Sequence, residues 1–319
     1  MNSLVNKKAV EFVSSLIYNI FRYVLLICVG YIVLYPILKI VLSTFSLPEE
    51  LYAEGTGMIP NNPTFSNFKS IDYFFPYKKL FSTTIKISVF CTILQLISCS
   101  LVGYGLGRYK FKGSGLVYAA VLFTVILPTQ ITLIPGYYNY RFFDIFGIGQ
   151  LVGLFTGETL TFNLLNNFMA MYTPALFGVG IKSGIYIFLF RQYFASMPKD
   201  LEEAAKIDGC GPLKTFLRVM LPNIKPVIVT VALLSMIYYW NDSLVSGVMI
   251  IPQEGMTLMQ GISDLKYHSV NSSFKESDAA QALVQRYTAM LVTIAPLTIM
   301  FVSAQKFFVE CMDRSGSKG

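Results

Sequence analysis

The chain has 319 residues, of which 54% are hydrophobic and only 13% are charged. Soluble globular domains carry a charge on about 25% of their residues, so this composition excludes an ordinary soluble protein and indicates a membrane protein. The net charge of +7 is spread over separate segments without forming a basic stripe, which argues against a nucleic-acid partner.

Six apolar stretches are long enough, or nearly so, to cross about 30 Å of hydrocarbon as helices. They lie at residues 20–45, 83–107, 116–137, 174–195, 225–251 and 287–310. The first stretch lacks a small-residue cleavage site and is expected to remain as an anchor. The sequence therefore predicts an all-α integral membrane protein. Its expected parts are a lead-in at 1–19, a transmembrane domain at 20–310 and a tail at 311–319.

Basic residues predict the orientation of these spans. If the N-terminus lies inside, the inner segments hold 14 lysines and arginines and the outer loops hold 7. An excess of positive charge marks the cytoplasmic side of a membrane protein. We therefore expect both termini, and the polar segment at 191–226, to face the cytoplasm.

The third stretch contains Pro128 and Pro135, which are expected to kink it, and between them Gln130, an amide that hydrocarbon does not accept unpaired. An interhelical hydrogen bond and a substrate contact both explain Gln130. The long external segment that follows, residues 138–173, contains apolar residues at helical spacing. It is suited either to dock an external partner or to cover the fold.

No site for catalysis or for a metal emerges from the sequence. The segment Gly180–Gly184 lacks the Gly-Lys pair and the upstream glycine of a phosphate-binding loop, so the chain is not expected to hydrolyse ATP itself. Lys182 is expected to snorkel or to pair within the bundle. With one histidine and no C-x-x-C motif, the five cysteines offer no zinc site of the usual spacing, and we expect no metal.

Residues 191–226 form the longest polar interruption of the chain, with ten charged residues. Because a bilayer core tolerates almost no charge, this segment must meet water. Acidic residues follow Pro198 as in a first helical turn, and Gly209, Gly211 and Pro212 are expected to end one helix and start a second. The pattern predicts a helix-turn-helix with small residues, Ala204 and Ala205, on one face.

The fifth stretch holds the single tryptophan of the chain in the run Tyr239-Trp240-Asn241-Asp242. A charge at the centre of a membrane helix costs about 2.5–3.5 kcal/mol on insertion scales, so Asp242 is expected to face a cavity or a partner. An aromatic ring beside amide and carboxylate groups suits a sugar, and a structural polar cluster between helices explains the same residues.

The segment at 191–226 resembles the EAA loop of ABC-importer permeases. The matching residues are Glu203, Ala204, Ala205, Asp208, Gly209, Leu221 and Pro222. The first external loop, PNNPTFSNF, and the Trp-Asn-Asp run resemble the sugar-importing members, so the resemblance extends over nearly the whole chain. It implies the type I ABC-importer permease fold with six transmembrane helices and a cytoplasmic coupling helix-turn-helix, in the plasma membrane of a prokaryote.

The resemblance implies a maltose-type permease subunit that imports a carbohydrate, with an oligosaccharide as the expected cargo. The chain would be no enzyme, since two cytoplasmic ATPase subunits would bind ATP and Mg²⁺ and close around its loop from Lys199 to Leu221. The other implied partners are a second permease subunit, an external solute-binding protein and membrane lipid. Candidate pathway residues are Gln130, Tyr239, Trp240, Asn241 and Asp242. Candidate ATPase contacts in the tail are Ser315, Gly316, Lys318 and Gly319.

Three alternatives stay open at this point. The first is a permease for amino acids or peptides within the same family. The second is an ion-coupled secondary transporter, and the third is a membrane scaffold or assembly subunit without transport activity of its own. For a secondary transporter, Asp242 would be the basis of an ion site, and the polar segment at 191–226 would have no explanation.

Overall fold

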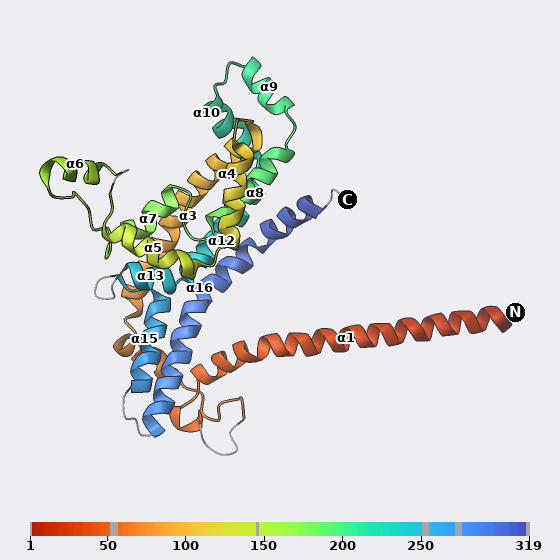
Figure 1. The fold of residues 1–319 in the computed structure, drawn as a ribbon. Helices are drawn as coiled ribbons and strands as arrows, with labels where there is room; N and C mark the ends of the chain where they lie inside the picture. Colours follow the sequence, from red (N-terminus) through yellow and green to blue (C-terminus); the bar gives the residue numbers. More distant parts are fainter. Residues whose placement is uncertain (1, 52–56, 145–146, 251–254, 272–275, 317–319) are drawn as a thin grey trace. The chain divides into compact units, whose positions relative to one another are not determined.

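A computed structural model describes the chain except for residue 1 and residues 52–56, 145–146, 251–254, 272–275 and 317–319 (Figure 1). The described part is helical, with one isolated β-bridge between Phe143 and Phe162. The helices are α1 (Asn2–Thr44), α2 (Ser66–Phe74), α3 (Tyr77–Arg108), α4 (Ser114–Ile126), α5 (Thr129–Arg141), α6 (Ile148–Thr156), α7 (Met169–Leu176), α8 (Ser183–Ser196), α9 (Asp200–Ile207), α10 (Pro212–Thr215), α11 (Leu221–Asn223), α12 (Lys225–Trp240), α13 (Leu244–Met249), α15 (Leu258–Asn271) and α16 (Glu276–Gly316).

The helices form two compact units. The first comprises residues 1–74 and 268–292, and the second comprises residues 75–267 and 293–319. In the first unit, the side-chain amide of Asn67 donates to the backbone carbonyls of Thr44 and Ser46, at 2.8 and 3.0 Å. These hydrogen bonds tie α2 to the end of α1.

Three helices of the described residues are long and apolar enough to cross a membrane: 13–44 in α1, 77–108 in α3 and 279–306 in α16. Two bent pairs pass the same criterion together, namely α4 with α5, bent by 107°, and residues 212–223 with α12, bent by 82°. Length and composition therefore support up to five spans in the described residues, while the sequence predicts six.

The third predicted stretch, 116–137, is not one kinked helix. Leu127 and Pro128 adopt extended backbone, with ψ of 122° and 137°, and they separate α4 from α5. A residue before proline is pushed out of the helical region, because its backbone and Cβ clash with the proline ring. Helix α4 therefore ends at Ile126, before Leu127 and Pro128, whereas Pro135 is accommodated inside α5.

The fourth and fifth predicted stretches are also wrong as continuous helices. Residues 174–195 divide into the end of α7, a loop, and α8, because Gly178 and Lys182 take positive φ values of 71° and 59°. The 14 residues of α8 span about 21 Å, which is less than the roughly 30 Å of a hydrocarbon core. The fifth stretch stops at Trp240 and resumes as α13 after Ser243.

The second unit is built around α3, which packs against α7, α8 and α12. Gly103 and Gly107 allow α8 to approach closely. A Cβ at Gly103 would lie 2.5 Å from the Cβ of Phe190, and one at Gly107 would lie 3.1 Å from the carbonyl oxygen of Arg191. Small residues bring helix backbones together in membrane proteins in this way. Within this unit, Figure 1 shows α9 and α10 beyond the ends of α3, α4 and α8.

Candidate functional site

The polar loop, residues 191–226, has the helix-turn-helix form that the sequence predicts. Helix α9 carries three acidic residues in its first turn and ends at Ile207. Gly209 follows with a φ of 75°, a conformation that favours glycine because it has no Cβ. Pro212 opens α10, where its missing N–H costs nothing, and a π-helical turn at Phe216–Met220 leads into α11.

A buried ion pair fixes α9 to the end of α3. The guanidinium Nε of Arg108 lies 3.0 Å from the carboxylate of Glu202, and the two side chains are 5% and 16% exposed. Arg108 also donates to the backbone carbonyls of Phe194, Met197 and Pro198, at 3.2, 2.8 and 3.3 Å. The segment between α8 and α9 is therefore held at its backbone by one side chain from α3.

Tyr104 completes this attachment one turn earlier on α3. Its hydroxyl donates to Glu202 at 3.0 Å. Its ring packs against those of Phe194 and Phe216, with centroid distances of 5.2 and 5.1 Å. The aromatic cluster joins α3, α8 and the second half of the polar loop in one core.

The outward surface of the polar loop, which we call the loop face, consists of exposed residues on α9, on the turn and on α10–α11. The predicted pair Ala204 and Ala205 is split: Ala204 is exposed, and Ala205 is buried within the loop. Apart from Ala205 and the half-buried Leu221, the predicted coupling residues all lie on this face. They are Glu203, Ala204, Asp208, Gly209 and Pro222. Two apolar side chains that the sequence reading did not single out join them, Ile207 at 86% exposure and Leu213 at 65%.

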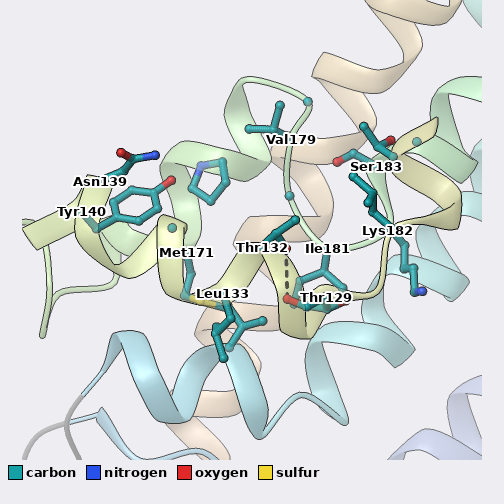
Figure 2. Close-up of a pocket in the computed structure, with 18 of the residues that line it drawn as sticks. Thr129, Thr132, Leu133, Asn139, Tyr140, Met171, Val179, Ile181, Lys182 and Ser183 are labelled. Carbon is teal, nitrogen blue, oxygen red and sulfur yellow. Dashed lines mark hydrogen bonds between the residues drawn. The ribbon is translucent and has the colours of Figure 1, made fainter. Parts of the chain in front are cut away.

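A cavity of about 990 Å³ lies in the second unit (Figure 2). Its walls come from α4, α5, the start of α6, α7, α8 and α13, from the loop between α7 and α8, and from Tyr239 of α12. Apolar side chains such as Leu133 and Met171 alternate with polar ones from Thr132, Asn139 and Tyr140. Figure 2 shows Asn139 and Tyr140 at one end of this group of side chains and Ser183 and Lys182 at the other. A few polar groups on a largely apolar wall are typical of a small-molecule site.

Gln95 holds the wall formed by the α7–α8 loop. This side chain of α3 is fully buried, and its amide nitrogen donates to the carbonyl of Ile181 and to the hydroxyl of Ser183, both at 2.7 Å. Its amide oxygen accepts a hydrogen bond from the Ser235 hydroxyl, also at 2.7 Å. One glutamine therefore connects α3, α8, α12 and the cavity wall. The feature that marked Gln130, an amide within an apolar stretch, also marks Gln95, which the sequence reading did not single out.

The predicted pathway residues do not lie together. Of the five, Tyr239 lines the cavity and is 2% exposed, whereas the Gln130 side chain is exposed on the isolated chain. Trp240 is buried, with its ring edge-to-face against Phe81 and its indole N–H donating to the carbonyl of Thr293 at 3.2 Å. Asn241 is exposed, and its amide donates to the carbonyl of Ile237 at 3.0 Å.

Asp242 caps the following helix. Its carboxylate accepts hydrogen bonds from the backbone N–H groups of Val245 and Ser246, at 3.1 and 2.7 Å, in the first turn of α13. A carboxylate at a helix N-terminus satisfies N–H groups that have no partner within the helix. The negative charge of Asp242 therefore lies at the N-terminus of α13, where backbone N–H groups stabilise it.

The predicted tail contacts lie partly outside the described residues. Ser315 and Gly316 lie at the end of α16, and Lys318 and Gly319 lie outside the described residues. The ammonium group of Lys182 lies 5.8 Å from the ring centroid of Tyr238, which is a cation–π contact within the bundle. Among the residues that the structure describes, no group of histidine, cysteine, aspartate or glutamate side chains could hold a metal ion.

Comparison with known proteins identifies relatives along the chain. Residues 100–313 match the family described as the binding-protein-dependent transport system inner membrane component. The arabinooligosaccharides transport permease AraQ of Halalkalibacterium halodurans is 29% identical, over 91% of this chain and 93% of the relative. The galactooligosaccharides transport permease GanQ of Bacillus subtilis is 26% identical, over 94% and 95% of the two chains.

A solved structure has the same fold. It is a bacterial ABC transporter involved in the import of the acidic polysaccharide alginate, and the match has a TM-score of 0.72 at 24% identity. The match covers 92% of this chain and 98% of the other. The all-α permease fold predicted from the sequence is confirmed, while the count of six spans stays a prediction.

Proposed function

This chain belongs to the family of binding-protein-dependent transport system inner membrane components, and from that premise we propose that it is a permease subunit of an ATP-driven carbohydrate importer. Relatives aligned over nearly the whole chain are named as permeases for arabino- and galactooligosaccharides, which supports an oligosaccharide as cargo. The observation that carries the proposal is the loop face, a rigidly attached helix-turn-helix that presents acidic, small and apolar side chains outward.

In this proposal, a cytoplasmic ATPase subunit docks on the loop face. Ile207 and Leu213 supply apolar contact, Ala204 permits close approach, and Glu203 pairs with a basic residue of the ATPase. Such an ion pair is weak when exposed and matters more once the interface excludes water. The tail residues Ser315, Gly316, Lys318 and Gly319 are a second proposed contact.

Movement of the ATPases then reaches the cavity through α8. This helix runs from Ser183, in the cavity wall, to Ser196, next to the backbone that Arg108 holds. A displacement of the loop face shifts α8 as a rod and changes the wall at Gly180–Ser183. ATP binding and hydrolysis supply the driving force by favouring one of two arrangements of the bundle.

The partners in this proposal are two ATPase subunits that bind ATP and Mg²⁺, a second permease subunit and an external solute-binding protein. We propose Tyr239 as the pathway residue among the five predicted, together with Asn139, Tyr140 and Thr132 of the cavity wall. Aromatic rings that stack on sugar C–H faces beside hydrogen-bonding groups suit an oligosaccharide. Both termini face the cytoplasm in this arrangement, in the plasma membrane of a prokaryote.

The test is ATP hydrolysis by the complex purified through a tag on this chain, with and without a binding protein loaded with candidate oligosaccharides. We expect an ATPase to co-purify, and one loaded binding protein to stimulate hydrolysis several-fold. Absence of a co-purifying ATPase, or stimulation only by an amino-acid or peptide binding protein, would contradict the carbohydrate importer.

Two variants test whether the loop face couples the permease to the ATPase. We expect Gly209→Val and Glu203→Lys each to lower transport and stimulated hydrolysis at least several-fold, because the first cannot easily adopt a φ of 75° and the second reverses the docking charge. The matched controls are Gly115→Val, at an exposed glycine of α4 with equally open space around it and no positive φ, and Glu49→Lys on the first unit. Equal transport in all four variants would exclude the loop face as the docking surface.

A further inference from the structure

A short hairpin around α6 is not explained by transport coupling. We call residues 147–162 the α6 hairpin. Helix α6 is followed by a turn at Gly157, with a φ of 79°, and the returning chain meets the helix where the Leu160 N–H donates to the Gly149 carbonyl at 3.3 Å. Figure 1 shows α6 away from the helices around α3.

The hairpin is held firmly at its base. The carboxylate of Asp144 accepts hydrogen bonds from the N–H groups of Gly149 and Gln150, at 2.7 and 3.0 Å. Phe143 and Phe162 exchange two backbone hydrogen bonds of 2.9 Å. A Cβ at Gly149 would overlap the Leu160 carbonyl, so only glycine permits this close packing. The exposed side chains are therefore displayed by a defined scaffold.

The outward side of α6 is apolar. Leu154 and Phe155 are 80% and 91% exposed, and Leu151 and Ile148, one and two turns earlier, are more than half exposed. Residues 145–157 contain no charged side chain, and the charges resume at Asp144 on one side and Glu158 on the other. Four adjacent large apolar side chains without a charge form a surface that water does not favour.

An exposed apolar stripe also runs along α5, the helix that precedes α6 in the chain. Ile131, Ile134, Tyr138 and Phe142 recur every three or four residues and are all more than half exposed. On α5 this stripe lies opposite the cavity-lining residues Gly136 and Tyr140, while Phe142, just beyond the helix, itself borders the cavity. Since α5 belongs to a helix pair apolar enough to cross a membrane, the α6 surface follows directly on one suited to lipid.

A soluble partner fits this surface poorly. A binding protein docks and leaves in each transport cycle, so a docking patch would be left in water between encounters, and interfaces of that kind carry polar rims. Lipid is present throughout the cycle. The small size of the helix and its uncharged, aromatic-containing face are suited to the boundary between headgroups and acyl chains.

We propose that the apolar face of α6, formed by Ile148, Leu151, Leu154 and Phe155, lies in the bilayer at the boundary of headgroups and acyl chains. The base of the same hairpin contributes to the cavity, since Asp144, Gly147 and Gln150 are among its lining residues. The hairpin is thus a lipid-anchored part of the cavity wall. This inference does not depend on the nature of the cargo.

The test measures the lipid exposure of Phe155 in the assembled complex. Reactive native cysteines are replaced by serine, Phe155→Cys or Glu158→Cys is introduced, and a nitroxide label is attached after reconstitution into phosphatidylcholine–phosphatidylglycerol nanodiscs. We expect oxygen, which concentrates in lipid, to relax the label at 155 several-fold more effectively than a water-soluble nickel chelate does. The label at 158, beyond the turn, should show the reverse preference.

Two results would overturn the proposal. Nickel-accessible labels at both positions would show that α6 lies in water. Low accessibility at 155 to both reagents would show that protein covers it, which indicates the second permease or the binding protein as occupant. Because the labels report environment directly, neither reading depends on whether the variants transport sugar.

Discussion

At the scale of single residues, two adjacent glutamates of α9 have different environments. Glu202 is largely buried against Arg108 and Tyr104, whereas Glu203 is exposed on the loop face. Neighbouring residues on a helix point about 100° apart, so one turn of α9 faces both inward and outward. The motif drew attention to Glu203, but Glu202 is the residue that holds the motif in place.

We predict that Arg108→Ala destabilises the complex by about 3 kcal/mol, at the lower end of the range for breaking a buried ion pair because Glu202 is 16% exposed. The substitution leaves the Glu202 charge and three backbone carbonyls without their donor. The readout is the thermal midpoint of the detergent-solubilised complex. Lys112→Ala, an exposed cation a few residues later, should leave that midpoint unchanged. Similar midpoints for the two variants would refute a structural role for Arg108.

Gln95 supports a second prediction at this scale. Gln95→Leu has a similar size but removes the donor to the carbonyl of Ile181 and to the hydroxyl of Ser183, and the acceptor of the Ser235 hydroxyl. Buried groups without partners cost about 1–3 kcal/mol each, so the thermal midpoint of the complex should fall clearly. The matched control is Gln130→Leu, whose amide is exposed in the isolated chain and should matter little for stability. A larger loss at Gln130 than at Gln95 would reverse this assignment.

At the scale of elements, the breaks between helices define the molecule. Hydropathy predicted α1, α3 and α16 well, because the helix continues there, in α1 and α16 even through Pro36 and Pro296. Hydropathy predicted α4 and α5 as one span, and α7 and α8 as another. Apolar side chains continue through both breaks, whereas the helical backbone is interrupted there. The break at Pro128 had a local signal. The break at Lys182 depends on Gln95, 87 positions earlier, and no local pattern announces such a partner.

In the candidate site, too, features set by local backbone geometry could be predicted from the sequence, and features set by distant contacts could not. The form of the polar loop was predictable because Gly209 and Pro212 act through their own backbone geometry. Which alanine faces outward was not predictable, since Ala205 is buried by the turn at Phe216–Met220. The sequence did not predict the cavity, because its walls come from helices that are far apart in the chain, from α4 to α13.

Helix α13 supports the prediction at this scale. If Asp242 acts as a cap, Asp242→Asn should retain most of the stability and transport, because an amide oxygen still accepts a backbone hydrogen bond. Asp242→Leu should lose about 0.5–2 kcal/mol of stability, the usual cost of losing a helix cap. Thermal unfolding and sugar uptake are the measurements. Loss of uptake in Asp242→Asn at unchanged stability would instead support a substrate contact.

At the scale of the whole molecule, the proposed function depends on which side of the membrane the polar loop faces. The excess of basic residues on one side predicts that residues 191–226 lie in the cytoplasm, and the proposed docking of ATPases requires the same orientation. Cys210 is a natural reporter, since it lies in the turn of that loop as a partly exposed free thiol, while Cys91 and Cys99 are buried. Cys28 is exposed but lies in the apolar helix α1, where a charged reagent does not enter.

We therefore predict that a membrane-impermeant maleimide labels Cys210 in inside-out vesicles and not in right-side-out vesicles. Cys311, which is expected on the same side, is replaced by serine so that the signal belongs to Cys210, and Cys210→Ser supplies the blank. Docked ATPase should slow the labelling several-fold, because the turn then lies within an interface. Labelling from the outside would invert the topology and would leave the loop face without access to ATP, so it would refute the coupling proposal as well as the orientation. Labelling from the inside without protection by the ATPase would keep the orientation and place the docking surface elsewhere.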